Sequence, residues 1–217
     1  MNEAKPVLAI ETSSDLCSVA LYSGAGENFC FDIRQKHIHS EKLIPMIDTI
    51  LGYAGKKVGD LSHIAVSMGP GSFTGLRIGL SAAKGIAFGG GIPICPVPTF
   101  DAFAYSLAGI LAEGSEFVIA RNVNVDELYC SRYAVAGGSY KTVTPLDIIK
   151  KSGFEAYIKK DDLIFGNYGV KSDMHKTDTD ALSIAKWSLK FGKPLLTEDF
   201  DFLEPDYLKK FEGRKLK

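Results

Sequence analysis

The residues best suited to hold a phosphate group form a glycine-rich segment at 69–75 (GPGSFTG), between an apolar run and a long helical pattern. Backbone amides in such a segment can surround a phosphate. The spacing is not that of a dinucleotide fingerprint, because the third glycine falls one residue late, and no lysine follows it as in a Walker motif. Pro70 also has no N–H to donate. The pattern favours a tight strand-to-helix turn over a phosphate site.

A second polar segment, residues 11–15 (ETSSD), ends the first apolar run of the chain. An acid followed by hydroxyls at a hairpin can hold a metal-bound phosphate, or the same side chains can hydrogen-bond to the amides of a turn. Composition alone favours the turn.

The histidines offer little chemistry at their spacing. His37 and His39 would share a face of a strand, but no carboxylate or cysteine is placed to complete a metal site, so we expect a solvated strand end. His175 lies among aspartates in a segment typical of a loop that ends in a helix N-cap. Spacing indicates no Ser/His/Asp or Cys/His nucleophile, and we therefore predict no catalytic residues.

Two helices are predicted beside these polar segments, one from Ser40 to Ala54 and one from Ser72 to Phe88. The second contains Gly75, Gly79 and Gly85, each of which costs about 1 kcal/mol relative to alanine. Its apolar arc is wider than one sheet requires. Either this helix is buried on two sides within its own domain, or a second helix from a partner packs on its small residues.

The remaining pattern predicts an α/β protein with a repeated βββαβα unit. The first half shows strands at 7–10, 17–22, 28–35, 63–68 and 91–98, followed by a helix at 99–113. The second half shows strands at 117–120, 127–135 and 140–143, a short helix at 144–151, a strand at 162–167 and a helix at 178–192.

Composition narrows the class of protein. The chain has 217 residues and a net charge of −1, and both halves are close to neutral, unlike a basic nucleic-acid module. We find no long apolar run that would span a membrane and no secretory leader pattern. The four cysteines have no CxxC or close even spacing, which favours buried thiols in a reducing cytoplasm. We therefore expect a cytoplasmic protein.

Two long segments resemble the bacterial TsaB family, also called YeaZ. They are residues 8–22 (LAIETSSDLCSVALY) and 67–104 (SMGPGSFTGLRIGLSAAKGIAFGGGIPICPVPTFDAFA). Residues 39–51 (HSEKLIPMIDTIL) match the first helix of that family, and EPDYLKKF near the end resembles its C-terminal signature. One position departs from the family: Ile119 stands where an aspartate is usual, before Ala120 and Arg121.

The resemblance implies a two-lobed fold of the actin, hexokinase and Hsp70 (ASKHA) type, with two ribonuclease-H-like lobes. We place them at 1–98, carrying the partner-binding helices, and at 99–217, which is more divergent. The first lobe would retain a vestigial nucleotide site formed by Glu11, Thr12, Ser13, Ser14, Gly69, Gly71 and Ser72.

The implied function is that of a non-catalytic subunit in N6-threonylcarbamoyladenosine modification of tRNA beside the anticodon. Its partner would be the transferase TsaD, with the ATPase TsaE and the tRNA reached through the complex, and the chain would form a homodimer when alone. The predicted interface comprises Leu43, Ile47, Ile50, Leu51, Gly75, Leu76, Ile78, Gly79, Ala82, Ala83 and Ile86. We expect no tightly bound cofactor, and a nucleotide only at the interface of the complex.

The resemblance also implies that the chain binds no metal. The two metal-binding histidines of TsaD correspond here to Thr99 and Phe103, and phenylalanine cannot ligate a metal. The second half lacks the glycine-rich phosphate loop expected of an ATP-binding member of this fold, and its nearest candidate, residues 166–171 (GNYGVK), matches such a loop only weakly. The alternative is an active metal- or ATP-dependent enzyme, either metallopeptidase-like or sugar-kinase-like. A basic tail is the remaining candidate for a weak tRNA contact, although a solvated tail is favoured: Lys209, Lys210, Arg214, Lys215 and Lys217.

Overall fold

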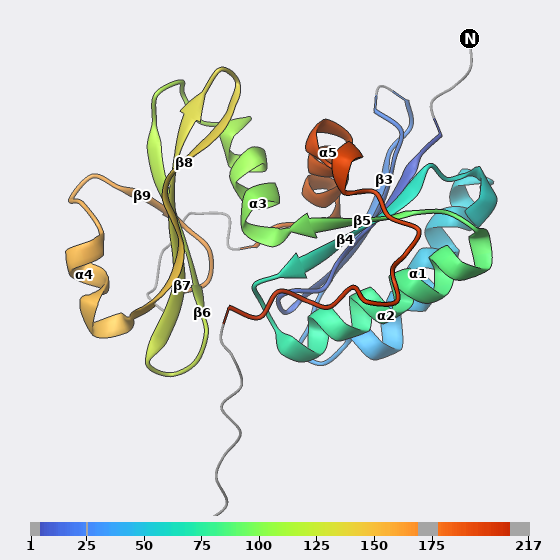
Figure 1. Ribbon diagram of the computed structural model, residues 1–217, viewed down its shortest axis with the longest axis horizontal. Helices are drawn as coiled ribbons and strands as arrows, with labels where there is room; N and C mark the ends of the chain where they lie inside the picture. Colours follow the sequence, from blue (N-terminus) through green and yellow to red (C-terminus); the bar gives the residue numbers. More distant parts are fainter. Residues whose placement is uncertain (1–4, 25, 169–177, 209–217) are drawn as a thin grey trace, which may run out of the picture.

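The computed structural model describes residues 5–24, 26–168 and 178–208, which form two β-sheets with helices around them (Figure 1). Of the weak phosphate-loop candidate at 166–171, residues 166–168 are described and residues 169–171 are not. His175 and the basic tail also lie outside the described residues. In the part of the chain that is described, no helix is both long and apolar enough to cross a bilayer.

The first sheet has the strand order β3-β2-β1-β4-β5. Its strands are β1 (Val7–Glu11), β2 (Leu16–Tyr22), β3 (Phe29–Arg34), β4 (His63–Gly69) and β5 (Ile94–Pro98). The first three form the predicted meander, and β4 and β5 run parallel to β1. All five side chains of β1 are buried, because both faces of the sheet are covered.

Two helices cover one face of this sheet, α1 (His39–Ala54) and α2 (Phe73–Gly90). Each ends at a glycine with positive φ, Gly55 and Gly91, in the left-handed conformation that a helix C-terminus favours. Between α1 and β4 lies a short 3₁₀ turn, Val58–Asp60. The buried core on this side includes Leu8, Ile10, Leu43, Ile47 and Ile50.

The second sheet has the order β8-β7-β6-β9. It consists of β6 (Glu116–Asn122), β7 (Glu127–Ala136), β8 (Ser139–Lys150) and β9 (Leu163–Phe165). The prediction of a helix at 144–151 is wrong, since β8 continues through this segment, paired with β7 from Ala136–Ser139 to Glu127–Lys150. Cross-strand pairing overrides the local helix signal there.

The predicted element order of the second half is nevertheless confirmed, since a 3₁₀ turn (Lys151–Gly153) and a short helix, α4 (Phe154–Tyr157), precede β9. The last helix, α5 (Ala181–Phe191), begins at Asp180, whose side chain accepts from the Ser183 amide. The helix predicted at 99–113 is shorter, α3 (Thr99–Ala108).

Each half of the chain contributes a helix that packs on the sheet of the other half. β5 ends at Pro98 and β6 begins at Glu116, with α3 packed on the second sheet between them. Helix α5 instead returns to the first sheet and covers the face opposite α1 and α2, where the Ala181 amide donates to Ser18 Oγ at 2.8 Å.

Residues 193–208 also return to the first sheet and cross α2 (Figure 1). They include a 3₁₀ turn (Lys193–Leu195) and a bridge between Thr197 and Ile94. Lys84 Nζ donates to the Asp201 carbonyl, and the Asp206 amide donates to the Met68 carbonyl.

Three of the four thiols are buried as expected. Cys30 is an exception because β3 is an edge strand whose alternate side chains face solvent.

Candidate functional site: a cleft between the two sheets

A cleft of about 1060 Å³ lies between the first and second sheets. Its wall on the first sheet is the β1–β2 turn together with the start of α2, and its opposite wall comes from β6, β7 and the loop between them. Residues from both halves line it, among them Ser13, Ser14, Gly71, Arg121, Tyr129 and Asp178. Strand ends that meet at a junction of this kind are where α/β proteins commonly bind ligands.

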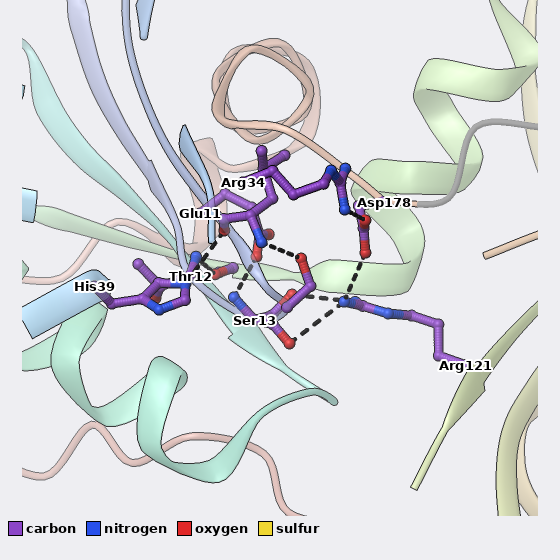
Figure 2. A network of polar contacts seen from close by, with 10 residues as sticks. Glu11, Thr12, Ser13, Arg34, His39, Arg121 and Asp178 are labelled. Carbon is purple, nitrogen blue, oxygen red and sulfur yellow. Dashed lines mark hydrogen bonds and ion pairs between the residues drawn. The ribbon is translucent and has the colours of Figure 1, made fainter. Parts of the chain in front are cut away.

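Arg121 projects from β6 across this junction to the turn at the end of β1 (Figure 2). Its guanidinium donates to Ser13 Oγ at 3.1 Å and to the Ser13 carbonyl at 3.3 Å, and it lies 3.5 Å from the carboxylate of Asp178. Arg121 is only 6% exposed, and Asp178 is 4% exposed. Asp178 also pairs with Arg34 on β3, so four elements of the chain meet at this ion-pair network.

Glu11, the last residue of β1, lies behind the same turn and is fully buried. Its Oε1 accepts from the Ser13 amide, and among the described residues its Oε2 has no hydrogen-bond partner. Burial raises the pKa of Glu11 to about 7, although the positive charge of Arg121 and the hydrogen bonds from Ser13 act in the opposite direction.

The start of α2 is attached to this turn by hydrogen bonds. Thr12 Oγ1 donates to the Gly75 carbonyl at 2.8 Å, and the Ser72 amide donates to the Ser13 carbonyl at 2.8 Å. Ser72 caps the helix by accepting from the Gly75 amide. The glycine-rich segment is thus a strand-to-helix turn, as predicted, held against the end of β1.

Six of the seven residues predicted as a vestigial nucleotide site therefore lie at or directly behind the cleft. Ser13, Ser14, Gly71 and Ser72 line the cleft, while Glu11 and Thr12 are buried behind it. Gly69 lies apart from the cleft lining, with its amide donating to Thr99 Oγ1 at 2.9 Å.

The predicted placement of the small residues of α2 is wrong. A Cβ on Gly75 would overlap the Thr12 carbonyl, and a Cβ on Gly79 would overlap Thr12 Oγ1. These glycines permit α2 to approach its own β1, so they cannot touch a partner. The other interface candidates that are buried in this chain's own core are Ile47, Ile50, Leu76 and Ala83. Leu43 is 1% exposed as well, but it lines the groove between α1 and α2.

Four predicted interface residues remain partly exposed: Leu51, Ile78, Ala82 and Ile86. Ile78 and Ala82 line a shallow groove of about 630 Å³ between α1 and α2, which Ile44 also lines while 53% exposed. The wide apolar arc of α2 thus divides between its own sheet and this groove.

The residues considered as metal ligands have structural partners instead. His39 is the first residue of α1 and is buried, with Nε2 near the Leu16 carbonyl, so the expectation of a solvated position is wrong for His39. His37 is exposed, as expected. Phe103 is 1% exposed in the core beside the second sheet. The described residues contain no group of three or more His, Cys, Asp or Glu side chains able to hold a metal ion.

Sequence reasoning missed the network of Arg34, Arg121 and Asp178. A charged residue at the end of the apolar run FVIA was the available signal for Arg121. Asp178 lies 57 positions further along the chain, and no spacing rule connects the two.

The model of the family described as "TsaD: tRNA N6-adenosine threonylcarbamoyltransferase" matches residues 34–202. A Haemophilus influenzae protein named "tRNA threonylcarbamoyladenosine biosynthesis protein TsaB" is 35% identical over 126 residues, covering 58% of this chain and 52% of that protein. The Bacillus subtilis protein of the same name is 28% identical over 170 residues, covering 78% of this chain and 73% of that one. The chain thus spans about half the length of the first of these relatives.

Solved structures share the fold. A Pseudomonas aeruginosa protein described as similar to the peptidase YEAZ superposes with a TM-score of 0.75 at 22% identity, over 94% of this chain and all of that one. YeaZ from Pseudomonas aeruginosa gives a TM-score of 0.69 at 22% identity, over 87% and 94%. With the family model matching well over half of its residues, the chain belongs to the TsaD-related family of tRNA threonylcarbamoyladenosine biosynthesis proteins, in its TsaB (YeaZ) branch.

Proposed function

We propose that this chain is a non-catalytic subunit that binds the transferase TsaD and supports N6-threonylcarbamoyladenosine modification of tRNA beside the anticodon. The observation that carries the proposal is the groove between α1 and α2, where apolar side chains remain partly exposed. Ile44 is 53% exposed there, and Ile78 and Ala82 are partly buried beside it. Contiguous apolar surface with a polar rim is typical of a protein–protein contact.

The rim of the groove suits a partner helix. Ser40, Thr74 and Ser81 supply hydroxyls, and Arg77 supplies a positive charge above the ring of Phe73, 3.9 Å from its centroid. Two helices from each chain would then pack together, and a second copy of this chain would occupy the same surface when TsaD is absent.

The side chains at the positions of the TsaD metal ligands support a non-catalytic role. Phe103 has no ligating atom, and the Thr99 hydroxyl accepts a hydrogen bond from the Gly69 amide. We propose that TsaD supplies the catalytic centre. The ATPase TsaE and the tRNA would bind through the complex, and any nucleotide would bind only where two subunits meet. We further propose that the complex acts in the cytoplasm.

Capture by purified TsaD tests the proposal. Ile44→Glu and Ser81→Arg each place a charge in the groove at a solvent-facing position, so both variants should fold normally and capture less than a tenth as much TsaD as the unmodified chain. Ile110→Glu is the matched control, because Ile110 is 74% exposed and lies outside the groove. Wild-type capture by both groove variants, with melting temperatures unchanged, would refute the proposed interface.

A metal- or ATP-dependent enzyme is the second candidate, and the cleft between the sheets is the observation that favours it. Calorimetry of the isolated chain with Mg²⁺–ATP separates the two. An enzyme of the sugar-kinase type would bind ATP in the cleft without a partner, whereas the subunit role predicts no binding by the chain alone.

A further inference from the structure

Among the described residues, two sets of contacts between the two sheets stand out. The first is an aromatic cluster among α3, α5 and β8, in which Phe191 packs edge-on against Tyr105 and Tyr140. Trp187 Nε1 also donates to the Tyr140 hydroxyl at 3.0 Å. The chain passes from the first sheet to the second through α3, beside this cluster, and returns to the first sheet between β9 and α5.

The second set lies at the cleft and depends on Arg121. This side chain starts on the second sheet, yet its hydrogen bonds to Ser13 reach the first. Asp178 lies directly before α5, which packs on the first sheet, and it contacts both Arg121 and Arg34. The guanidinium therefore has acceptors from two segments that join elements packed in or on the first sheet, although it starts on the second.

We propose that Arg121 is a latch that holds the cleft closed, while the aromatic cluster of α3, α5 and β8 is the fixed side about which the two sheets open. Removing this buried guanidinium should destabilise the closed arrangement of the two sheets, because it leaves a buried carboxylate and a buried carbonyl oxygen without one of their hydrogen-bond donors.

The latch also reaches the start of α2. The Ser13 carbonyl accepts from both Arg121 and the Ser72 amide, and Thr12 binds the Gly75 carbonyl. Opening the cleft therefore loosens the first turn of α2, whose Phe73 lines both the cleft and the α1–α2 groove. Lobe closure and the shape of that groove are coupled through one short turn.

Distance measurement between spin labels tests the latch. Labels at Asp48→Cys on α1 and Val125→Cys in the β6–β7 loop beside the cleft, in a Cys30→Ser background, lie at exposed positions on opposite sides of the cleft and away from the aromatic cluster. Arg121→Gln should broaden the distance distribution and move its centre to a longer distance. Hydrogen exchange at the Ser72 amide should become at least about tenfold faster in the same variant.

Arg132→Gln is the matched control. Arg132 is also buried, but it lies on β7 and pairs with Asp162 inside the second half, so its loss should leave the interlobe distance unchanged. If Arg121→Gln does not fold, Ser13→Ala removes one acceptor without stranding a charge and should move the distribution in the same direction. An unchanged distribution in the folded Arg121 or Ser13 variant, or equal opening in the Arg132 control, would overturn the latch.

Discussion

Arg121 and Glu11 act on Ser13 from opposite sides: the arginine binds its side-chain and carbonyl oxygens from the second sheet, and the glutamate accepts its amide from within the first. Both hydrogen bonds from Arg121 are long-range in sequence, because Arg121 is 108 positions from Ser13. The turn after β1 is thus fixed by both halves of the chain.

The charge of Arg121 should be measurable through Glu11. Because the nearby guanidinium lowers the pKa of Glu11 against the larger effect of burial, Arg121→Gln should raise this pKa further above its present value of about 7. Carbon-detected NMR titration of the side-chain carboxyl measures it directly. Arg132→Gln, which removes a cation outside this site, should leave the pKa of Glu11 in place; a fall in the Arg121 variant would show that the cleft admits water to Glu11.

Stability against pH should contain two opposing contributions. Glu11 has its pKa raised from 4.5 to about 7, so its contribution is fully present below pH 4.5 and is lost as pH rises through about 7. Burial lowers the pKa of His63 from 6.5 to about 4, so its contribution is present above pH 6.5 and is lost as pH falls through about 4. Each shift corresponds to about 3 kcal/mol.

Single variants separate the two contributions. Relative to the unmodified chain, Glu11→Gln should gain stability as pH rises from 4.5 to 7, and His63→Gln should lose it as pH rises from 4 to 6.5. Urea unfolding at four pH values between 4 and 7.5 gives both slopes. Parallel curves for a variant and the unmodified chain would show that the residue does not titrate in this window.

The glycines of α2 should respond oppositely to alanine. Gly79→Ala forces a methyl group against Thr12 and should cost about 1–3 kcal/mol of unfolding free energy. Gly85 faces open space in the same helix, so Gly85→Ala should stabilise by about 1 kcal/mol. Denaturant unfolding measures both, and a tolerated Gly79→Ala would mean that α2 does not pack closely on β1.

The purified chain should contain far less than one equivalent of zinc or iron after dialysis, and alone it should not transfer threonylcarbamoyl to tRNA. The reason is the absence of ligating atoms at Phe103, together with the engaged hydroxyl of Thr99. Elemental analysis checks the first expectation, and a metal-to-protein ratio near one would contradict it.

Periodicity and turn chemistry were sufficient for most of the elements. The apolar run 7–10 predicted a strand buried on both faces, and residues 7–11 form one at the centre of the first sheet. The helix predicted from Ser72 has Ser72 as its N-cap, and the helix predicted at 178–192 begins after the N-cap Asp180; capping side chains act within one turn, so such helix starts are marked locally in the sequence. The segment 144–151 was misassigned as a helix because its hydrogen-bonded pairing with β7, which is distant in sequence, outweighs its local helix propensity.

What the sequence alone determined is the series of elements and the segments that would form the polar turns, since both depend on interactions between near neighbours. The tertiary structure decided which face of each element is occupied. The small residues of α2 are needed by β1 rather than by a partner, and Arg121 reaches Ser13 only because two sheets fold against each other. Contacts of this kind depend on three-dimensional packing between distant segments, for which a one-dimensional pattern carries no signal.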